Sequence, residues 1–190
     1  FLANTMGLAQ SNAKRMLAYS SVSHVGYLAL IFFGLNSLSA YNLAFYLFAY
    51  SLATIGVMMC LIWVEKLKRE TSFEAFKGLA HSELLLAIVA AISMLSMAGI
   101  PLTAGFMGKF GIFAQAIKDT PFLVLVAVLG SAISIAYYLR LIMVMFFPKE
   151  STFKTSERVS LTYNIVGVFI IFALIALGIF PDLFAKQFGL

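Results

Sequence analysis

The sequence predicts an all-α fold, a polytopic transmembrane bundle of about six membrane elements, one of them discontinuous. Hydrophobic residues make up 62% of the 190 residues and charged residues only 11%, whereas soluble domains carry about a quarter charged residues. The apolar runs are about 18 to 27 residues long, enough to cross a hydrocarbon core of about 30 Å as helix. They lack the period-two alternation of a membrane barrel. Lipid is therefore the expected solvent.

The first two elements end where turn-forming or charged residues begin. The first runs from about Arg15 to Phe33 and stops at the sequence GLNS, because Gly and Asn commonly end helices. The second runs from about Tyr41 to Val64 and stops at the charged sequence EKLKRE. The next stretch, TSFEAFKGLAHS, mixes aromatic and charged residues. We expect it to form a short amphipathic segment at the membrane surface.

The third element runs from about Glu83 to Ala98, and the fourth, from Pro101 to Lys118, is unusual. In the stretch AGIPLTAGFMGKFGIFA, Pro101 and several glycines surround a single lysine, Lys109. Proline and glycine weaken a helix and leave backbone carbonyls without intrahelical partners. The pattern predicts that Lys109 lies in a non-helical break whose polar groups receive its ammonium.

The last two elements are bounded by prolines. The fifth runs from about Pro121 to Phe147 and the sixth from about Leu161 to Phe180, followed by Pro148 and Pro181 respectively. The opening FLANTMGLAQ has neither the basic region nor the cleavage site of a signal peptide. We expect it to continue a helix that begins upstream, so that residues 1–190 form the transmembrane portion of a longer subunit.

The loop charges give a prediction of sidedness if the fourth element crosses the membrane fully. Lys149, Lys154 and Arg158 then lie on one face. The other basic loop residues lie on the opposite face, here the first face: Lys14, Arg15, Lys66, Lys68, Arg69, Lys77, Lys118 and Lys186. The excess of Lys and Arg would place the first face inside.

Lys109 is the strongest candidate for a functional residue. A charge at the centre of a bilayer costs about 2.5 to 3.5 kcal/mol by some estimates and much more by others. Lys109 lies eight residues after Pro101 and nine before Lys118, too far from either end to reach the interface easily. A proton-carrying role accounts for that cost. The alternative is that Lys109 pairs with a carboxylate of a neighbouring subunit during assembly.

His24 is the second candidate, and Lys14 is the third. His24 follows Lys14 by ten residues, roughly 15 Å along a helix, and Ser20, Ser21 and Tyr27 share its face. Histidine titrates near neutrality, which suits a proton relay, although a serine hydroxyl could equally satisfy it in helix packing. Lys14 is expected at a membrane face, as a relay, as an entrance for protons, or simply extended toward water.

Other ionisable residues and other classes of site are less informative. Arg140 lies seven residues from Phe147 and is expected to play a structural role near the interface. Cys60 stands alone in an apolar run, and only His24 and His81 could supply imidazole ligands, so no metal or haem site is expected. The 13 Lys and Arg residues are scattered, which argues against nucleic-acid binding. No cofactor is expected in this chain.

Two motifs together resemble a known family. QSNAKRMLAYSSVSHVGY and SMAGIPLTAGFMGKF resemble the antiporter-like membrane subunits of respiratory complex I, the proton-pumping NADH:quinone oxidoreductases. The resemblance covers the whole chain and is closest to the C-terminal part of the N type. L- and M-type relatives carry His, and the L type also Lys, where this chain reads YLFAYSLAT. The M type carries Glu where Lys109 stands.

The resemblance implies a proton-translocating subunit in which Lys109 exchanges protons with a hydrated axis that His24 and Lys14 join or approach. It implies other membrane-arm subunits and the lipid bilayer as partners. Quinone, flavin and iron–sulfur clusters would lie in other subunits, and the location would be a bacterial inner membrane or an equivalent energy-transducing membrane. It also places the end of the last helix on the outer face, against the loop count. A multisubunit cation/proton antiporter and a non-pumping scaffold remain alternatives.

Overall fold

The computed structural model describes residues 1–148, 153 and 158–185 and contains no β-strand within them, as the all-α prediction requires. Every predicted membrane element has a helical counterpart. The helices are α1 (Leu2–Leu8), α2 (Ala13–Ala29), η1 (Leu30–Phe32), α3 (Ser39–Lys68), η2 (Phe73–Phe76), α4 (Leu79–Ser82), α5 (Leu84–Ala98), α6 (Ala104–Ala116), α7 (Pro121–Phe146), α8 (Leu161–Ile179) and α9 (Asp182–Ala185).

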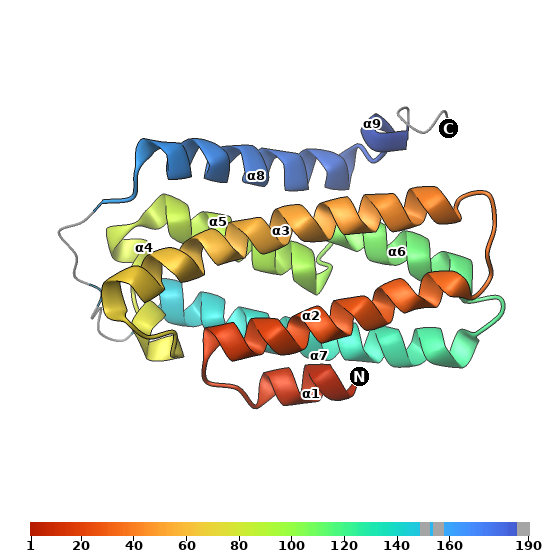
Figure 1. Cartoon of the computed structure of the whole chain (residues 1–190), viewed down its shortest axis with the longest axis horizontal. Helices are drawn as coiled ribbons and strands as arrows, with labels where there is room; N and C mark the ends of the chain where they lie inside the picture. Colours follow the sequence, from red (N-terminus) through yellow and green to blue (C-terminus); the bar gives the residue numbers. More distant parts are fainter. Residues whose placement is uncertain (149–152, 154–157, 186–190) are drawn as a thin grey trace.

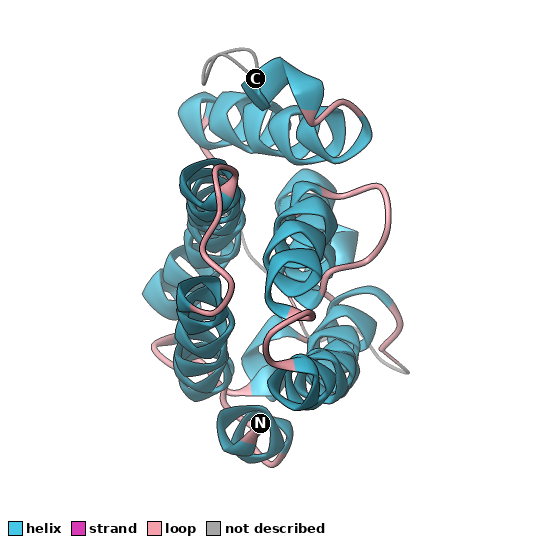
Figure 2. Ribbon diagram, turned by 90° about the vertical axis from the view of Figure 1, so that its right-hand side faces the viewer, coloured by secondary structure: helices cyan, strands magenta, loops and turns pink. Residues whose placement is uncertain are grey.

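The long helices lie roughly along one axis in two layers (Figures 1 and 2). α2 and α3 form one layer, and α5, α6 and α7 form the other. α8 packs across α3, α5 and α6 at one edge of the bundle, while α1 packs against α2 and α7 at the opposite edge. Within the described residues, α3, α7 and α8 are each long and apolar enough to cross a membrane by themselves.

α5 and α6 are two halves of one membrane crossing, which corrects the prediction of two separate elements. α5 has 15 residues and α6 has 13, so each is only about 20 Å long, too short for a hydrocarbon core of about 30 Å. They follow one another end to end and together extend about as far as α3 (Figure 1). The discontinuity therefore lies between them, at Gly99–Thr103.

A single broken crossing also changes the sidedness. The described basic residues at the end where α2 begins, the left of Figure 1, are Lys14, Arg15, Lys66, Lys68, Arg69, Lys77 and Arg158. Lys118 lies at the opposite end, after α6, whereas Lys149, Lys154 and Lys186 are outside the described residues. By the positive-inside rule, the first end, here called the basic face, is expected to be the inner side. In that orientation α8 would end on the outer side, which agrees with what the family resemblance implies.

The segment after α3 is amphipathic, as predicted, and its apolar side packs on the rest of the protein. η2 and α4 bury Phe73, Phe76 and Leu79 against the ends of the long helices. Glu74 and His81 of the same segment are exposed. Buried alanines and glycines elsewhere in the bundle allow the helices to approach closely, and the largest fully buried side chains include Tyr46, Tyr137 and Tyr138. The centre of this bundle is consequently rich in hydroxyl groups.

Candidate functional site

Lys109 lies inside the bundle, and its ammonium group contacts the broken end of α5. The side chain emerges from α6 and the residue is only 4% exposed. Its Nζ donates hydrogen bonds to the carbonyl oxygen of Ala98 at 3.0 Å and to Ser131 Oγ of α7 at 2.7 Å. Ser131 Oγ in turn donates to the same carbonyl at 3.2 Å. Lys109 was predicted within the break itself; instead it is helical and reaches back to the break.

The break is built from residues that end one helix and start the next. Gly99 adopts φ 84°, in the left-handed region where glycine ends helices without strain, and Leu102 also has a positive φ of 72°. Thr103 precedes α6, and its hydroxyl donates to the carbonyl of Ile100 at 2.7 Å. The turn leaves the Ala98 carbonyl facing Lys109. A side chain on Gly99 would crowd this contact, because its Cβ would lie 3.1 Å from Lys109 Cδ.

The glycines of α6 act through packing, and α6 remains helical through all of them. A Cβ on Gly105 would overlap the carbonyl oxygen of Ser96 in α5. On Gly108 it would lie 2.7 Å from the ring of Tyr46, and on Gly111 2.7 Å from the side-chain oxygen of Asn42. These contacts bring α6 against α5 and α3. The sequence interpretation that the glycines weaken the helix around Lys109 is therefore wrong.

His24 lies in the same interior as Lys109. It is 2% exposed, and its Nδ1 is 2.7 Å from the hydroxyl of Tyr46. Its ring stacks on Tyr50, with centroids 4.5 Å apart, and meets the edge of Tyr27 at 5.7 Å. Lys109 Nζ lies over that Tyr27 ring, 5.0 Å from the centroid. Tyr27 thus contacts both candidate residues.

A chain of polar contacts leads from this centre toward the basic face. Asn4 of α1 donates to the hydroxyl of Tyr27 at 2.7 Å and accepts from the hydroxyl of Tyr137 at 3.0 Å. Tyr137 packs against Tyr138, with ring centroids 4.6 Å apart, and the hydroxyl of Tyr138 is hydrogen-bonded to Ser20. These groups are almost fully buried. Helix interfaces inside a membrane bundle are usually packed with apolar side chains, whereas α1, α2 and α7 meet here through hydrogen-bonded polar groups.

A second polar cluster lies nearer the outer end, between α3 and α6. Gln115 donates to Ser39 Oγ at 2.8 Å and to the carbonyl of Ile31 at 3.2 Å, and it accepts from Asn42 at 3.1 Å. A cavity of about 160 Å³ adjoins this cluster and is lined partly by Asn42, Gly108 and Asp182. Gly108 precedes Lys109, so the cavity approaches the candidate site from the outer side.

A larger cavity, about 480 Å³, lies between α6 and α7 directly beside Lys109. Its walls are mainly apolar and include Phe110 and Phe113, while Lys109 and Ser131 supply its polar side-chain groups. A water molecule occupies about 30 Å³ in the liquid and needs polar partners. Only the part of the cavity next to Lys109 and Ser131 offers such partners; the remainder is lined by apolar side chains.

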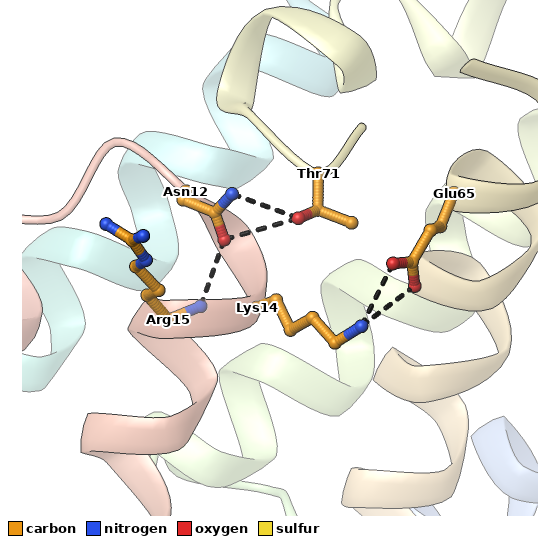
Figure 3. Close-up of polar contacts among 5 residues, drawn as sticks. All are labelled: Asn12, Lys14, Arg15, Glu65 and Thr71. Carbon is orange, nitrogen blue, oxygen red and sulfur yellow. Dashed lines mark hydrogen bonds and ion pairs between the residues drawn. The ribbon is translucent and has the colours of Figure 1, made fainter. Parts of the chain in front are cut away.

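Lys14 is not part of the buried cluster. It lies on the basic face, where its side chain is 60% exposed and its Nζ is 2.9 Å from Glu65 Oε1 (Figure 3). Nearby, Asn12 caps α2 by accepting from the backbone N–H of Arg15 at 3.1 Å, and it bonds Thr71 through its side chain. These contacts fix the start of α2, the helix that carries His24 and Tyr27.

Arg140 has a structural role, as expected. Its guanidinium donates to the carbonyls of Leu8 and Gln10 after α1 and lies 4.5 Å from the ring centroid of Phe73. His81 is exposed. No group of three His, Cys, Asp or Glu residues that could hold a metal ion occurs in the described part of the chain. The site therefore depends on hydrogen bonds and one buried amine.

Sequence reasoning missed Asn4 and Ser131 and gave Tyr137 no role. Each is a polar residue within an apolar run, which is the only signal the sequence offers. Their contacts join residues 22 to 133 positions apart. A periodic pattern within one helix cannot show such pairings.

Comparison with known proteins identifies the family. The sequence model described as "NADH:quinone oxidoreductase/Mrp antiporter, TM" matches residues 1–134, more than half of the chain. The chain belongs to this family. It is a multi-pass membrane protein, as the sequence predicts.

Its relatives include NADH-quinone oxidoreductase subunit N of Flavobacterium psychrophilum, 38% identical over 186 residues, which are 97% of this chain and 40% of that protein. Subunit N of Cytophaga hutchinsonii is 39% identical over 176 residues, 92% of this chain and 38% of that protein. The predicted resemblance to the N type is confirmed. The chain spans about two-fifths of the length of these relatives.

Solved structures share the fold. Respiratory complex I from Thermus thermophilus with bound aureothin contains a chain that is 35% identical with a TM-score of 0.80, covering 96% of this chain and 41% of that one. The membrane-bound sulfane sulfur reductase, an archaeal respiratory membrane complex, contains a chain that is 28% identical with a TM-score of 0.85, covering 96% of this chain and 37% of that one. The predicted transmembrane helical fold is confirmed.

Proposed function

We propose that this chain is part of a proton-translocating membrane subunit of an NADH:quinone oxidoreductase, in which Lys109 carries the proton. The observation that supports the proposal most directly is the buried Lys109 ammonium, which is hydrogen-bonded to two neutral oxygens beside a break in a membrane crossing. Within the described residues no carboxylate forms an ion pair with it. A lysine held by a carboxylate would keep its proton; this one has only neutral partners.

The partners of Lys109 suit both protonation states. When the amine is charged, Ser131 accepts from Nζ and donates to the Ala98 carbonyl, as the geometry shows. When the amine is neutral, the same hydroxyl can rotate and donate to the nitrogen lone pair, because a hydroxyl is both donor and acceptor. Burial disfavours the charged form of an amine and a hydrogen-bond acceptor favours it. Lys109 can therefore gain and lose a proton without leaving a buried polar group unpaired.

His24 and Lys14 have supporting roles in this proposal. His24 and Lys109 both contact the ring of Tyr27, so a positive charge on His24 would disfavour the charged form of Lys109. Lys14 and Glu65 mark the aqueous end of α2, from which Ser20 leads into the buried tyrosines. Proton exchange would be driven by charge changes elsewhere in the complex. Quinone, flavin and iron–sulfur clusters would belong to other subunits, and this chain would pass no electrons.

Substitution of Lys109 in the intact complex tests the proposal. Lys109→Ala should leave the complex assembled, because it removes the cost of burying a charge together with its hydrogen bonds. It should strongly reduce the number of protons pumped per electron. Lys118→Ala is the matched control, since Lys118 is exposed at the end of the same crossing, and it should pump normally. Normal pumping by the Lys109→Ala complex would leave only the scaffold function.

A multisubunit cation/proton antiporter is the second candidate, because the family description also names such antiporters. Ion dependence separates the two functions. In membranes that contain the intact complex, oxidation of NADH by a proton pump should acidify one side in the absence of sodium. An absolute requirement for sodium, or ion exchange without any redox partner, would favour the antiporter.

A further inference from the structure

We propose that the ring face of Tyr27 is the electrostatic partner of the charged form of Lys109, and that Asn4 is the positioning residue that holds this ring in place. The inference rests on the proposed function, because it concerns how Lys109 keeps its proton at one stage of the cycle. It begins from the surroundings of Nζ: two neutral oxygens, and the ring of Tyr27 with its centroid 5.0 Å away.

The face of an aromatic ring carries negative charge density and attracts a cation, more strongly when both are removed from water. Tyr27 and Lys109 are each only 4% exposed, so bulk water screens this contact little. A ring differs from a carboxylate in an important respect. It favours the charged amine without a full negative charge, and so it does not trap the proton.

The Tyr27 ring is held on several sides. His24 meets it nearly at right angles, with an interplanar angle of 76°, and Phe113 does so at 79° and a centroid distance of 5.8 Å. These contacts limit tilting of the ring. The hydroxyl is fixed separately, because it accepts the hydrogen bond from Asn4 Nδ2.

Asn4 is placed to join the hydroxyls of Tyr27 and Tyr137. It is fully buried and comes from α1, while its two partners, Tyr27 and Tyr137, come from α2 and α7. Gly130 of α7 provides the space, since a Cβ there would lie 2.9 Å from Asn4 Nδ2 and 3.5 Å from the Tyr27 hydroxyl. A larger residue at position 130 would push the amide away from the ring that it anchors.

Four of the elements that pack against α6 contribute polar or aromatic groups at Lys109 or next to its partners. α5 contributes the Ala98 carbonyl and α7 contributes Ser131. α2 contributes Tyr27 and His24, and α3 contributes Tyr46, which is bonded to His24. His24 is the one imidazole among these groups. The test therefore changes the ring electronically and leaves His24 in place.

The experiment uses fluorinated phenylalanines at position 27 in the intact complex. Tyr27→Phe is the parent, and one, two or three ring fluorines then weaken the ring face progressively with little change in shape. We expect the alkaline limit of pumping per electron to move stepwise to lower pH, by about 1 unit over the series, as the charged amine loses its partner. The same series at Phe45, a buried ring of α3 that packs on Phe184, should cause no shift.

Asn4 is tested by a double-mutant cycle. Asn4→Leu and Tyr27→Phe each remove the anchoring hydrogen bond, so each should shift the alkaline limit in the same direction, and the double variant should shift it no further. Gly130→Ala should reproduce part of this shift.

A fluorine series at position 27 that matches the parent at every step would overturn the role of the ring. Additive effects of Asn4→Leu and Tyr27→Phe would overturn the role of Asn4. Failure of the underlying function is recognised separately, because Lys109→Ala would then pump normally.

Discussion

α3 and the α5–α6 crossing lie side by side and cover nearly the same distance, yet they differ in what they can hold. α3 is an unbroken helix of 30 residues, and its charged residues stand in its last turns, at Glu65, Lys66 and Lys68. At mid-depth it offers only hydroxyl groups such as those of Tyr46 and Tyr50. The α5–α6 crossing is interrupted after Ala98 and carries a buried lysine. Two neighbouring elements of similar length therefore differ in charge at mid-depth: α3 is neutral there, and the α5–α6 crossing carries Lys109.

The difference shows how a bilayer-spanning chain accommodates an amine. In a continuous helix the interior carbonyls accept from backbone N–H groups four residues later, and few are left to receive a side chain. Ending α5 at Gly99 turns the Ala98 carbonyl toward Lys109, and α7 adds Ser131. The break provides hydrogen-bond acceptors without placing a negative charge in the membrane.

The largest expected effect concerns the joint between the two halves. Gly105→Ala would force a Cβ onto the carbonyl oxygen of Ser96, which is backbone and cannot turn away. Overpacking of this kind costs about 3 kcal/mol or more in severe cases. We expect much less assembled complex on native gels. Gly26→Ala is the control, because a Cβ at Gly26 meets no atom within 4 Å; equal yields from the two variants would contradict the tight joint.

The next effect tests the link between the two crossings at the outer end. Gln115→Leu removes one hydrogen-bond partner each from Ser39, Asn42 and the carbonyl of Ile31. Ser39 and Asn42 keep a second partner, but the carbonyl of the buried Ile31 loses the amide of Gln115. A buried polar group left unpaired costs about 1 to 3 kcal/mol, so the complex should lose activity at a lower temperature. Gln10→Leu serves for comparison, since the side chain of Gln10 donates only to the Met6 carbonyl near the surface. If the cluster stabilises the complex, Gln115→Leu should lose activity at a clearly lower temperature than Gln10→Leu. Equal temperatures would contradict this.

A smaller effect is expected in the continuous helix. A Cβ at Gly56 of α3 would overlap the hydroxyl of Ser93, but this obstacle is a side chain that can rotate. Alanine also favours a helix over glycine by about 1 kcal/mol. Gly56→Ala should therefore change the thermal stability of the complex far less than Gly105→Ala, and adding Ser93→Ala should recover part of any loss. Equal destabilisation by both glycine variants would remove the distinction between the two crossings.

The smallest effect is expected at the inner end of α3. The ion pair between Lys14 and Glu65 joins side chains that are 60% and 40% exposed, and such pairs contribute about 0 to 1 kcal/mol and weaken with salt. Lys14→Ala should leave thermal stability and pumping nearly unchanged, because surface water can supply protons to α2 without it. A strong loss of pumping would instead make Lys14 an obligatory step of the path.

Local patterns were sufficient for much of this structure. Apolar runs and the residues that bound them predict the helices of the six membrane elements to within a few residues, and the cost of a buried charge singles out Lys109. The break was misplaced because Pro101 and the glycines of α6 give the same signal whether they end a helix or allow close packing. The two halves were read as separate crossings because each apolar run is close to the minimum length for one. Asn4, Ser131 and Gly130 act across helices distant in sequence, and only the packed bundle brings them together.

The central claim is that Lys109 must release its proton, and Lys109→Arg in the assembled complex tests it most directly. Arginine keeps the positive charge but cannot be deprotonated in proteins. The quantity to measure is the number of protons pumped per electron passed from NADH to quinone. The account predicts that the arginine complex pumps as poorly as Lys109→Ala. Pumping at the wild-type ratio would contradict it, and would show that position 109 supplies a fixed positive charge and carries no proton.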